Sequence, residues 1–419
     1  MPNELQQAIR QLISKYKNHY EIPPNSVPLS SPTFGEEEIL AAVEVMASSF
    51  VTNGKRVKQF EKEFAEYIDK KYAVMVNSGS SANLLLISSL LSPHCGLLHK
   101  GDEVIVPAVT WPTTIYPLAQ MGLKPILVDC DLETLNISPK KIRQAITKKT
   151  KAIMVVPILG NPCQMDEIKN ICDESGILLL EDTCESLGSE FKEKKCGSFG
   201  KAATFSFFFS HHMTCIEGGM IVTDNKTLAD TLLSQRSHGW TRDMLSREEM
   251  NLKYSDFDSR FLFVDMGFNL RSTELNAAMA SVQLKKLPQM NQSRIDLAKE
   301  LIKRLDKFST YFQFVQTPKE SLNTWFGFPF LLKKSAPFKR KDFTQHLEAH
   351  NIETRPITGG NLSLQPAFEL FDWESRGGLE NAQYIQEQGI YIGTHPGMNT
   401  DHIAHIENTF ASFIAKNRP

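Results

Sequence analysis

Short apolar runs alternate with amphipathic stretches over the first half of the chain. The runs at 103–107, 152–157 and 177–181 are almost continuously apolar, which is typical of strands buried on both faces of a parallel sheet. Similar runs predict further strands at 72–77, 125–129, 202–206 and 220–223. Helical spacing of apolar residues between the runs predicts helices at 35–46, 56–70, 82–91, 113–120, 138–147 and 165–174. Strands that alternate with helical crossovers predict an α/β domain built on a mostly parallel sheet with helices on both faces.

The pattern changes after a further helix predicted at 273–286. Charged helices predicted at 292–306, 340–349, 380–388 and 403–415 flank two apolar strands at 310–316 and 325–332. We therefore expect a large α/β domain at 35–287 and a smaller C-terminal α+β domain at 288–419. Ahead of them, residues 1–34 are expected to form a helix followed by an extended arm rich in proline.

The charge and the apolar content exclude several classes of partner. The 46 basic and 48 acidic side chains leave a formal net charge of −2, which gives no electrostatic reason to expect nucleic acid or an anionic membrane. The longest apolar stretches, such as residues 84–91, are far shorter than the roughly 20 residues that cross a bilayer. No signal-peptide pattern is visible at the N-terminus. These features predict a cytoplasmic enzyme.

The seven cysteines are an odd number, which argues against a disulfide framework. None of them forms a C-x-x-C pair. We interpret them as buried thiols that pack as small apolar side chains, with a metal or iron–sulfur site as the alternative. They are Cys95, Cys130, Cys163, Cys172, Cys184, Cys196 and Cys215.

The segment Asn77-Ser-Gly-Ser-Ser-Ala-Asn83 joins a predicted strand to a predicted helix. The start of a helix exposes backbone N–H groups and binds anions readily, and Gly79 allows the backbone to turn closely there. A helix start capped by serine, with no ligand, is the alternative. Gly79 and Ser80 are the candidate anion-binding residues.

Polar and aromatic side chains follow the ends of other predicted strands. Asp182 and Glu185 follow the strand at 177–181, and Trp111 follows the strand at 103–107. Because ligands bind beyond the carboxyl ends of parallel strands, we expect these side chains to lie near Gly79. An aspartate at a strand end is about as often a helix cap, and a lone tryptophan is usually a packing residue, so the residues alone leave both interpretations open.

The segment Ser206-Phe-Phe-Phe-Ser-His-His-Met-Thr-Cys-Ile-Glu-Gly-Gly219 carries a specific resemblance. It resembles the cofactor-lysine segment, S-F-x-x-x-K-N-x-T-x-G-E-G-G, of the DegT/DnrJ/EryC1 family of pyridoxal-phosphate sugar aminotransferases. In the family the lysine stands six residues before the glutamate, and His211 holds that position relative to Glu217. Histidine cannot form the stable imine by which lysine attaches the cofactor, so the resemblance implies a cofactor held by non-covalent contacts. An ordinary histidine pKa of about 6.5 would suit proton transfer at neutral pH.

The resemblance implies the pyridoxal-phosphate-dependent transferase fold type I, similar to aspartate aminotransferase, and it gives roles to the residues above. It implies that Gly79, Ser80 and Ser206 bind the cofactor phosphate and that Trp111 stacks on the pyridine ring. Asp182 would keep the pyridine nitrogen protonated, which makes the ring an electron sink. Glu185 stands where aminotransferases of the family carry glutamine or histidine near the phenolic oxygen, and it matches the dehydratase branch.

Other segments extend the resemblance over nearly the whole chain from about residue 27. Gly267-Phe-Asn-Leu-Arg271 is similar to a loop whose asparagine reaches the cofactor phosphate of the neighbouring subunit. The resemblance therefore implies that Asn269 completes the site of a partner and that the enzyme is an obligate homodimer with shared active sites. Segments at 238–242, 325–330, 354–361 and 393–396 also match the dehydratase branch.

Two kinds of relative that carry the histidine imply different chemistry. One holds a [2Fe–2S] cluster on four cysteines beyond the histidine, and no cysteine follows Cys215 here, so we expect the kind without a cluster. The resemblance to the kind without a cluster implies removal of the C3 hydroxyl from a nucleotide-linked 4-keto-6-deoxyhexose. The products would be a 3,6-dideoxy-4-keto sugar and ammonia, with His211 as the base. GDP-4-keto-6-deoxy-D-mannose is the expected substrate, and L-glutamate would regenerate pyridoxamine phosphate from pyridoxal phosphate. A CDP or dTDP sugar, a nucleotide-sugar aminotransferase and a non-catalytic protein on this fold are the alternatives.

Overall fold

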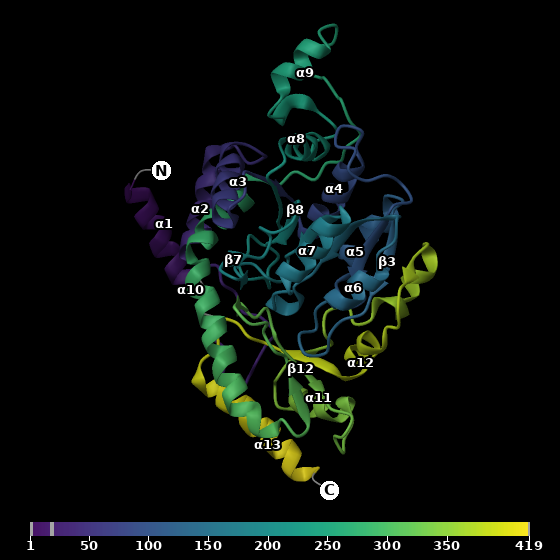
Figure 1. Ribbon diagram of the computed structural model, residues 1–419. Helices are drawn as coiled ribbons and strands as arrows, with labels where there is room; N and C mark the ends of the chain where they lie inside the picture. The colour runs from purple at the N-terminus through teal and green to yellow at the C-terminus, as the bar shows by residue number, and fades with distance from the viewer. Residues whose placement is uncertain (1–2, 17–20, 418–419) are drawn as a thin grey trace.

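The centre of the molecule is an eight-stranded sheet in the order β1-β9-β8-β5-β4-β2-β3-β14. The structure is a computed structural model, and it describes residues 3–16 and 21–417 (Figure 1). Strand β9 is antiparallel to its neighbours β1 and β8, and the other neighbouring strands run parallel. The prediction of a mostly parallel sheet is confirmed. The strands are β1 Tyr72–Val76, β2 Glu103–Pro107, β3 Lys124–Val128, β4 Thr150–Val155, β5 Leu178–Asp182, β8 Ala202–Ser206, β9 Gly219–Thr223 and β14 Glu374–Ser375.

Helices cover both faces of this sheet, because side chains alternate between the faces along each strand. In β2, Val104 and Val106 belong to the core under α4 and α5, while Ile105 belongs to the core under α6 and α7. The same alternation buries parts of β8 and β9 against α3. The helices of this domain are α2 Glu36–Ser48, α3 Lys55–Ile68, α4 Gly79–Leu91, α5 Pro112–Gln120, α6 Pro139–Ala145, α7 Met165–Ser175 and α8 Lys226–Gln235.

A second, four-stranded antiparallel sheet forms the small domain, at the bottom of Figure 1. Its order is β10-β12-β15-β13, and an aromatic core that includes the fully buried rings of Phe312, Phe330 and Phe343 packs on it. The elements are β10 Phe312–Phe314, β12 Phe328–Leu332, β13 Thr354–Arg355, β15 Gly389–Ile392, α11 Arg340–Ala349, α12 Glu380–Gln388 and α13 Thr400–Lys416.

One long helix, α10 (Glu274–Leu305), connects the two sheets. The prediction of separate helices at 273–286 and 292–306 was therefore wrong. Pro288 lies inside α10, where it removes one backbone donor and favours a break. The helix continues because both halves are packed, the first against α2 and α3 and the second in the small-domain core. The boundary expected at 287–288 falls inside this helix, so we keep the division into 35–287 and 288–419 as a proposal in which the domains share α10.

The N-terminal arm lies partly within the small domain. Helix α1 (Asn3–Tyr16) packs beside α2, and the remainder of the helix expected at the N-terminus, residues 1–2 and 17–20, lies outside the described residues. Val27 is fully buried in the small-domain core and bridges to Ile352. The arm predicted at 1–34 is thus a packed part of the fold from Val27 onward.

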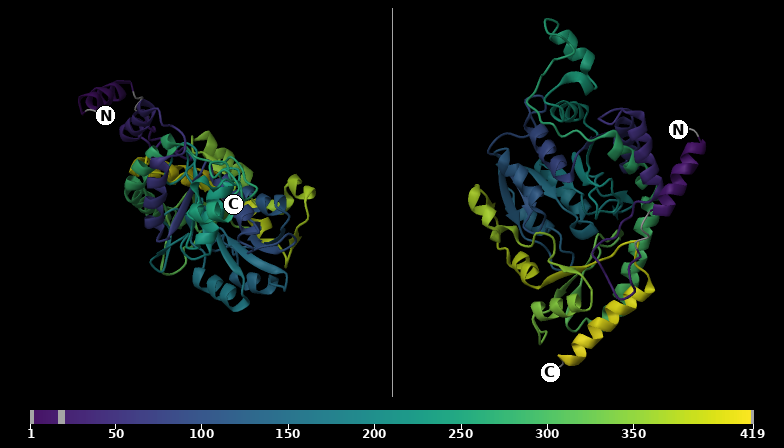
Figure 2. Two further views of the ribbon diagram at one scale, coloured as in Figure 1. Left: turned by 90° about the horizontal axis from the view of Figure 1, so that it is seen from above. Right: turned by 180° about the vertical axis from the view of Figure 1, so that it is seen from behind.

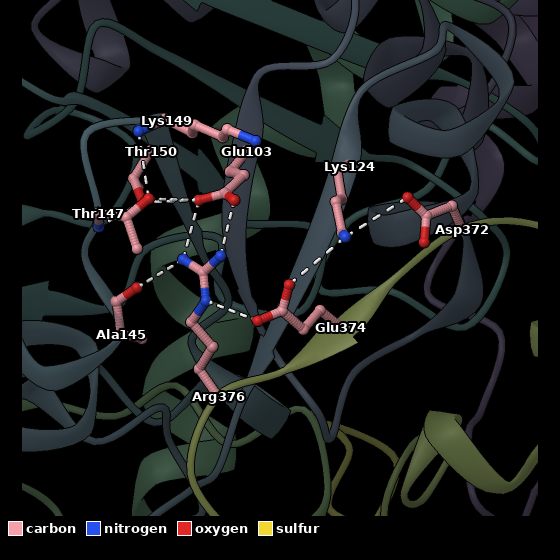
Figure 3. A network of polar contacts seen from close by, with 9 residues as sticks. All are labelled: Glu103, Lys124, Ala145, Thr147, Lys149, Thr150, Asp372, Glu374 and Arg376. Atoms are coloured by element: carbon pink, nitrogen blue, oxygen red, sulfur yellow. Dashed lines mark hydrogen bonds and ion pairs between the residues drawn. The ribbon is translucent and has the colours of Figure 1, made fainter.

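A short strand from the C-terminal part of the chain returns to the large sheet, which the sequence did not indicate. Strand β14 (Glu374–Ser375) pairs in parallel with β3. Arg376 then donates to both carboxylate oxygens of Glu103, at 2.6 and 2.8 Å, and to the carbonyl of Ala145 at 2.9 Å (Figure 3). The hydrogen bonds from Arg376 lower the pKa of Glu103 to about 2. This network anchors the C-terminal region to the edge of the large sheet.

Between α8 and α10 the chain forms a lobe, residues 240–266, that projects from the large domain and carries α9 (Arg247–Lys253) (Figures 1 and 2). A small sheet of β6 Glu190–Phe191, β7 Lys194–Lys195 and β11 Ser321–Leu322 joins the two domains. Within residues 3–16 and 21–417, none of the helices combines the length and the apolar character needed to cross a bilayer.

Candidate functional site

A cavity of about 510 Å³ lies at the carboxyl ends of the parallel strands, with the small domain forming part of its wall. This volume falls within the roughly 300–1,000 Å³ that is usual for small-molecule sites. The predicted site residues that line it are Gly79, Ser80, Trp111, Asp182, Glu185, Ser206 and His211. The structure therefore gathers every predicted site residue except Asn269 around one cavity.

The start of α4 forms one end of the cavity. The Ser78 hydroxyl caps the helix by accepting a hydrogen bond from the Ser81 N–H at 3.1 Å, and Gly79 and Ser80 supply the other N–H groups of the first turn. A Cβ atom on Gly79 would lie 2.5 Å from the Cβ of Ser206, so only glycine allows this approach. The helix start and the Ser206 hydroxyl together make a cradle suited to a phosphate group.

Asp182, at the end of β5, is held by two side chains. Its Oδ2 accepts hydrogen bonds from Asn83 Nδ2 and Thr114 Oγ1, both at 2.8 Å. Asn83 in turn accepts a hydrogen bond from Thr204 Oγ1 at 2.6 Å. A carboxylate fixed in this way can pair with a cationic ring N–H group. Sequence reasoning did not select Asn83 or Thr114, although Asn83 lies in the segment 77–83 that contains Gly79, and Thr114 stands three residues after Trp111.

Trp111 is the residue just before helix α5, and 56% of its surface is exposed. Its indole offers a large apolar surface to the cavity, which Thr114 also lines. An exposed aromatic ring in a ligand cavity is available for stacking on a planar ligand.

Glu185 lines the cavity, and its Oε2 accepts a hydrogen bond from the Leu159 N–H at 2.9 Å. Burial, with a smaller contribution from the nearby Asp182, raises the pKa of Glu185 to about 7. The carboxyl group is therefore protonated part of the time at neutral pH and can then donate a hydrogen bond. In this respect it can replace the glutamine or histidine that aminotransferases carry at this position.

His211 lies in a turn between β8 and β9, where its N–H donates to the Phe208 carbonyl at 3.0 Å. The imidazole lines the cavity edge-on to the rings of Phe208 and Phe326, with centroid distances of 5.9 and 5.0 Å. Its Nδ1 is buried and has no hydrogen-bond partner among the described residues. His212 is fully buried and does not line the cavity.

Burial, and secondarily the charge of Arg294, lowers the pKa of His211 to about 3. The expectation of an ordinary pKa near 6.5 was therefore wrong. The imidazole is neutral throughout the physiological pH range, so it can accept a proton without first losing one.

Asn269 is exposed and does not line the cavity of its own chain. It bridges to Ser237 at the base of the lobe of residues 240–266. The lobe exposes large apolar side chains, including Phe257, Phe261 and Met266. Several large apolar side chains exposed on one projecting segment are typical of protein–protein contacts.

The small domain brings residues that sequence reasoning did not assign to the site. Phe326, Arg355 and Tyr391 line the cavity beside residues of the large domain. Arg355 is the only lysine or arginine among the described residues of the lining, which also includes the acidic Asp182 and Glu185. The segments at 325–330 and 354–361 matched the family, but only the fold shows which of their side chains reach the cavity.

Comparison with known proteins identifies close relatives. The model of the DegT/DnrJ/EryC1/StrS aminotransferase family matches residues 32–411. The chain is 43% identical over 373 residues to the GDP-4-keto-6-deoxy-D-mannose 3-dehydratase of Escherichia coli O55:H7, covering 88% of this chain and 95% of that protein. It is also 43% identical over 371 residues to the Yersinia pseudotuberculosis protein of the same name, covering 88% and 94%.

Solved structures of such enzymes share the fold. The Escherichia coli GDP-4-keto-6-deoxy-D-mannose-3-dehydratase with bound hydrated PLP superposes with a TM-score of 0.87 at 40% identity, covering 93% of this chain and all of that one (100%). A GDP-4-keto-6-deoxymannose-3-dehydratase variant with bound GDP-perosamine has a TM-score of 0.85 at 40% identity, with coverage of 92% and 100%. A structure of the same enzyme with a trapped PLP-glutamate geminal diamine has a TM-score of 0.86 at 39% identity, again with coverage of 92% and 100%.

Proposed function

Because the chain belongs to the DegT/DnrJ/EryC1/StrS aminotransferase family, we propose that it is a pyridoxal-phosphate-dependent dehydratase of that family. It removes the C3 hydroxyl of a nucleotide-linked 4-keto-6-deoxyhexose and yields a 3,6-dideoxy-4-keto sugar and ammonia. The observation that carries the proposal is that His211, which stands six residues before Glu217 as the family's lysine does, lines the cavity. The relatives named as 3-dehydratases, at 43% identity over most of the chain, support the same activity.

GDP-4-keto-6-deoxy-D-mannose is the substrate we propose. Both relatives at 43% identity are named for it, and a related structure holds GDP-perosamine. The chain itself offers no sequence motif that selects guanine, so CDP and dTDP sugars are the competitors that the assay must include.

The residues of the cavity fit pyridoxal phosphate and pyridoxamine phosphate. The cradle of Gly79, Ser80 and Ser206 would hold the phosphate, Trp111 would stack on the ring, and Asp182 would pair with the ring N–H. When bound, the cofactor supplies an electron sink for carbanion chemistry. Asp182 is held in place for this pairing by its two hydrogen bonds.

His211 is the residue to which we assign proton transfer. Its Nδ1 is enclosed, so the ring nitrogen that can face a ligand is Nε2, which would accept the proton. No lysine is among the described residues that line the cavity, so no lysine amine of this lining competes for the substrate carbonyl. A neutral base without a nearby amine favours elimination over amino transfer.

L-glutamate is the second substrate, and it returns the cofactor to its amine form. A structure of a relative holds a PLP-glutamate adduct, which supports this assignment. Arg355 would attract the glutamate carboxylates, because it is the one positively charged lysine or arginine side chain among the described residues that line the cavity.

We further propose a homodimer in which Asn269 completes the phosphate site of the partner. The exposed position of Asn269 and the exposed apolar side chains of the neighbouring lobe support this arrangement. We also propose the cytoplasm as the compartment, since all seven cysteines are free thiols, as is usual in a reducing environment.

The decisive experiment incubates the purified protein with L-glutamate and GDP-4-keto-6-deoxy-D-mannose, and then measures ammonia, deoxy sugar and amino sugar by mass spectrometry. The proposal expects ammonia and a 3,6-dideoxy-4-keto sugar in equal amounts. A product that keeps the C3 hydroxyl and gains an amino group would identify an aminotransferase instead. Parallel reactions with CDP and dTDP sugars establish the nucleotide.

A further inference from the structure

A buried arginine lies behind the wall of the cavity. Arg294, on α10, is 2% exposed, and its Nη1 donates to the backbone carbonyls of Trp325 at 3.3 Å, Phe326 at 3.4 Å and Thr394. No carboxylate of the described residues pairs with it, whereas Arg236, which is buried equally deeply, pairs with Glu61 at 2.6 Å. A buried cation with only carbonyl partners is costly, so Arg294 contributes little to stability through charge.

Two of the three carbonyls that Arg294 binds, those of Trp325 and Phe326, belong to a strained turn. Trp325 has a φ of 50°, a left-handed conformation that is unusual for a bulky residue and that its surroundings must hold in place. The turn is also held from the other side, where the Phe326 N–H donates to the Leu159 carbonyl at 2.9 Å. Leu159 is itself bound through its N–H to the carboxyl group of Glu185.

The ring of Phe326 meets both adjacent histidines. Its centroid lies 5.0 Å from that of His211 and 5.9 Å from that of His212. Phe326 precedes β12 of the small domain, while the histidines belong to the large domain. The position of the Phe326 ring, and with it that of the His211 imidazole, therefore depends on how the Trp325–Phe326 turn is held.

We propose that Arg294 is a positioning residue for His211: it fixes the Trp325–Phe326 turn, and the Phe326 ring then fixes the imidazole. This inference rests on the proposed function, in which His211 transfers the proton. The guanidinium also places a positive charge behind the imidazole, which favours its neutral form and contributes to its low pKa. The other titratable or charged groups around the two residues are Asp182, Glu185, Glu217, Arg355, His212 and His395.

The test compares Arg294→Met, which keeps an unbranched apolar stem and removes the guanidinium, with Arg294→Lys, which keeps the charge. Arg304→Met is the matched control, because Arg304 lies on the same helix but pairs with Glu300 and Glu407 near the surface. In Arg294→Met we expect kcat for dehydration to fall about 10²-fold, the loss typical of a misplaced catalytic group, while the KM for the sugar and the affinity for pyridoxal phosphate change little. Arg294→Lys should recover part of the lost kcat, and Arg304→Met should resemble the parent enzyme.

A second readout does not depend on the reaction. NMR titration of the histidine side chains should show the His211 pKa rising by about one unit or more in Arg294→Met and staying low in Arg294→Lys and Arg304→Met. If the parent enzyme makes an amino sugar, the proposed function fails, but this titration still tests the link between Arg294 and His211. An unchanged kcat and an unchanged titration in Arg294→Met would overturn the inference, as would a loss of cofactor affinity equal to the loss of kcat.

If Arg294→Met does not fold, Phe326→Leu replaces it, because this change keeps the carbonyls that Arg294 binds and removes only the aromatic ring. The inference expects a similar fall in kcat with the affinity for pyridoxal phosphate retained. Full dehydratase activity in Phe326→Leu would overturn it.

Discussion

The imidazole of His211 stands edge-on against the ring of Phe326, with centroids 5.0 Å apart and ring planes at 76°. The two rings come from different domains, and no hydrogen bond to a described residue orients the Nδ1 atom of His211. The base of the proposed reaction is therefore oriented by aromatic packing. Its catalytic role and its environment can be tested separately.

Replacing His211 by asparagine should abolish most dehydration and keep cofactor binding. We expect kcat to fall by roughly 10²–10⁴-fold, the range usual for loss of a general base, because Gly79 and Asp182 remain in place. His212→Asn is the control, since His212 does not line the cavity and should retain far more activity. Because the pKa of His211 is about 3, its imidazole stays neutral between pH 8 and pH 5. Protonation of His211 should therefore cause no loss of rate in this range. An active His211→Asn beside an inactive His212→Asn would mean that the base is misassigned.

Borohydride should not fix pyridoxal phosphate to the parent enzyme. The reason is that His211 occupies the lysine position and no lysine is among the described residues of the cavity lining. Intact-protein mass spectrometry should show no added cofactor, whereas His211→Lys should gain it and show the absorbance of a covalently attached cofactor. A stable adduct on any lysine of the parent enzyme would contradict the assignment.

Glu185 should make the protein without bound cofactor less stable as the pH rises. Its pKa is raised from 4.5 to about 7 in the folded state, so between these values the folded chain holds a proton that the unfolded chain has released. Stability is therefore lost as the pH rises from about 4.5 through about 7. In Glu185→Gln this loss should disappear, raising the melting temperature by several degrees at pH 8 and changing it little at pH 4.5. An equal shift at both pH values would show that Glu185 is not protonated in the folded state.

Asn269 should contribute to cofactor retention in the dimer and not in the monomer. Asn269→Ala should weaken the affinity for pyridoxal phosphate while the mass measured by light scattering remains that of a dimer. Met266→Ser, in the exposed apolar part of the lobe, should instead lower the dimer fraction. Full cofactor affinity in a dilute monomer would exclude the shared site.

The link between Arg376 and Glu103 should contribute to stability. Arg376→Met leaves a buried carboxylate without its charged partner and should lower the free energy of unfolding by about 3 kcal/mol. The folded pKa of Glu103 is lowered to about 2, so the contribution is present above its unfolded value of 4.5 and is lost as the pH falls through 2. Arg260→Met, at the exposed ion pair with Asp258, should leave the stability almost unchanged, because water screens an exposed ion pair. Equal melting temperatures for Arg376→Met and Arg260→Met would show that the network in Figure 3 does not stabilise the fold.

Much of the large domain could be predicted because its strands are local apolar runs. Asp182 and Ser206 end such runs, and parallel strands carry their ends to one edge of the sheet, so the sequence indicated that these residues meet. The continuity of α10 across Pro288 could not be predicted, because tertiary packing on both halves outweighs the local preference of proline for a break.

The remainder of the site depends on contacts between distant segments. Phe326 and Arg355 reach the cavity only because the small domain packs against the large one, and β14 has too few residues to give a period-two signal. The low pKa of His211 has the same origin, since burial among residues from both domains causes it. Local patterns cannot reveal burial that is created by another domain.

The buried position of Val27 affects the order in which segments of the protein can reach their native positions during synthesis. Its backbone bonds to Asn351 and Glu353, and the neighbouring Leu29 N–H reaches the Glu353 carboxylate across 324 positions of the chain. During synthesis this arm leaves the ribosome early and must wait for residues that are translated far later. Contacts of such long sequence separation form slowly, and the apolar arm is exposed to other nascent chains in the interval. The arm is thus synthesised long before the residues on which it packs, and it can be among the last segments to reach its native place.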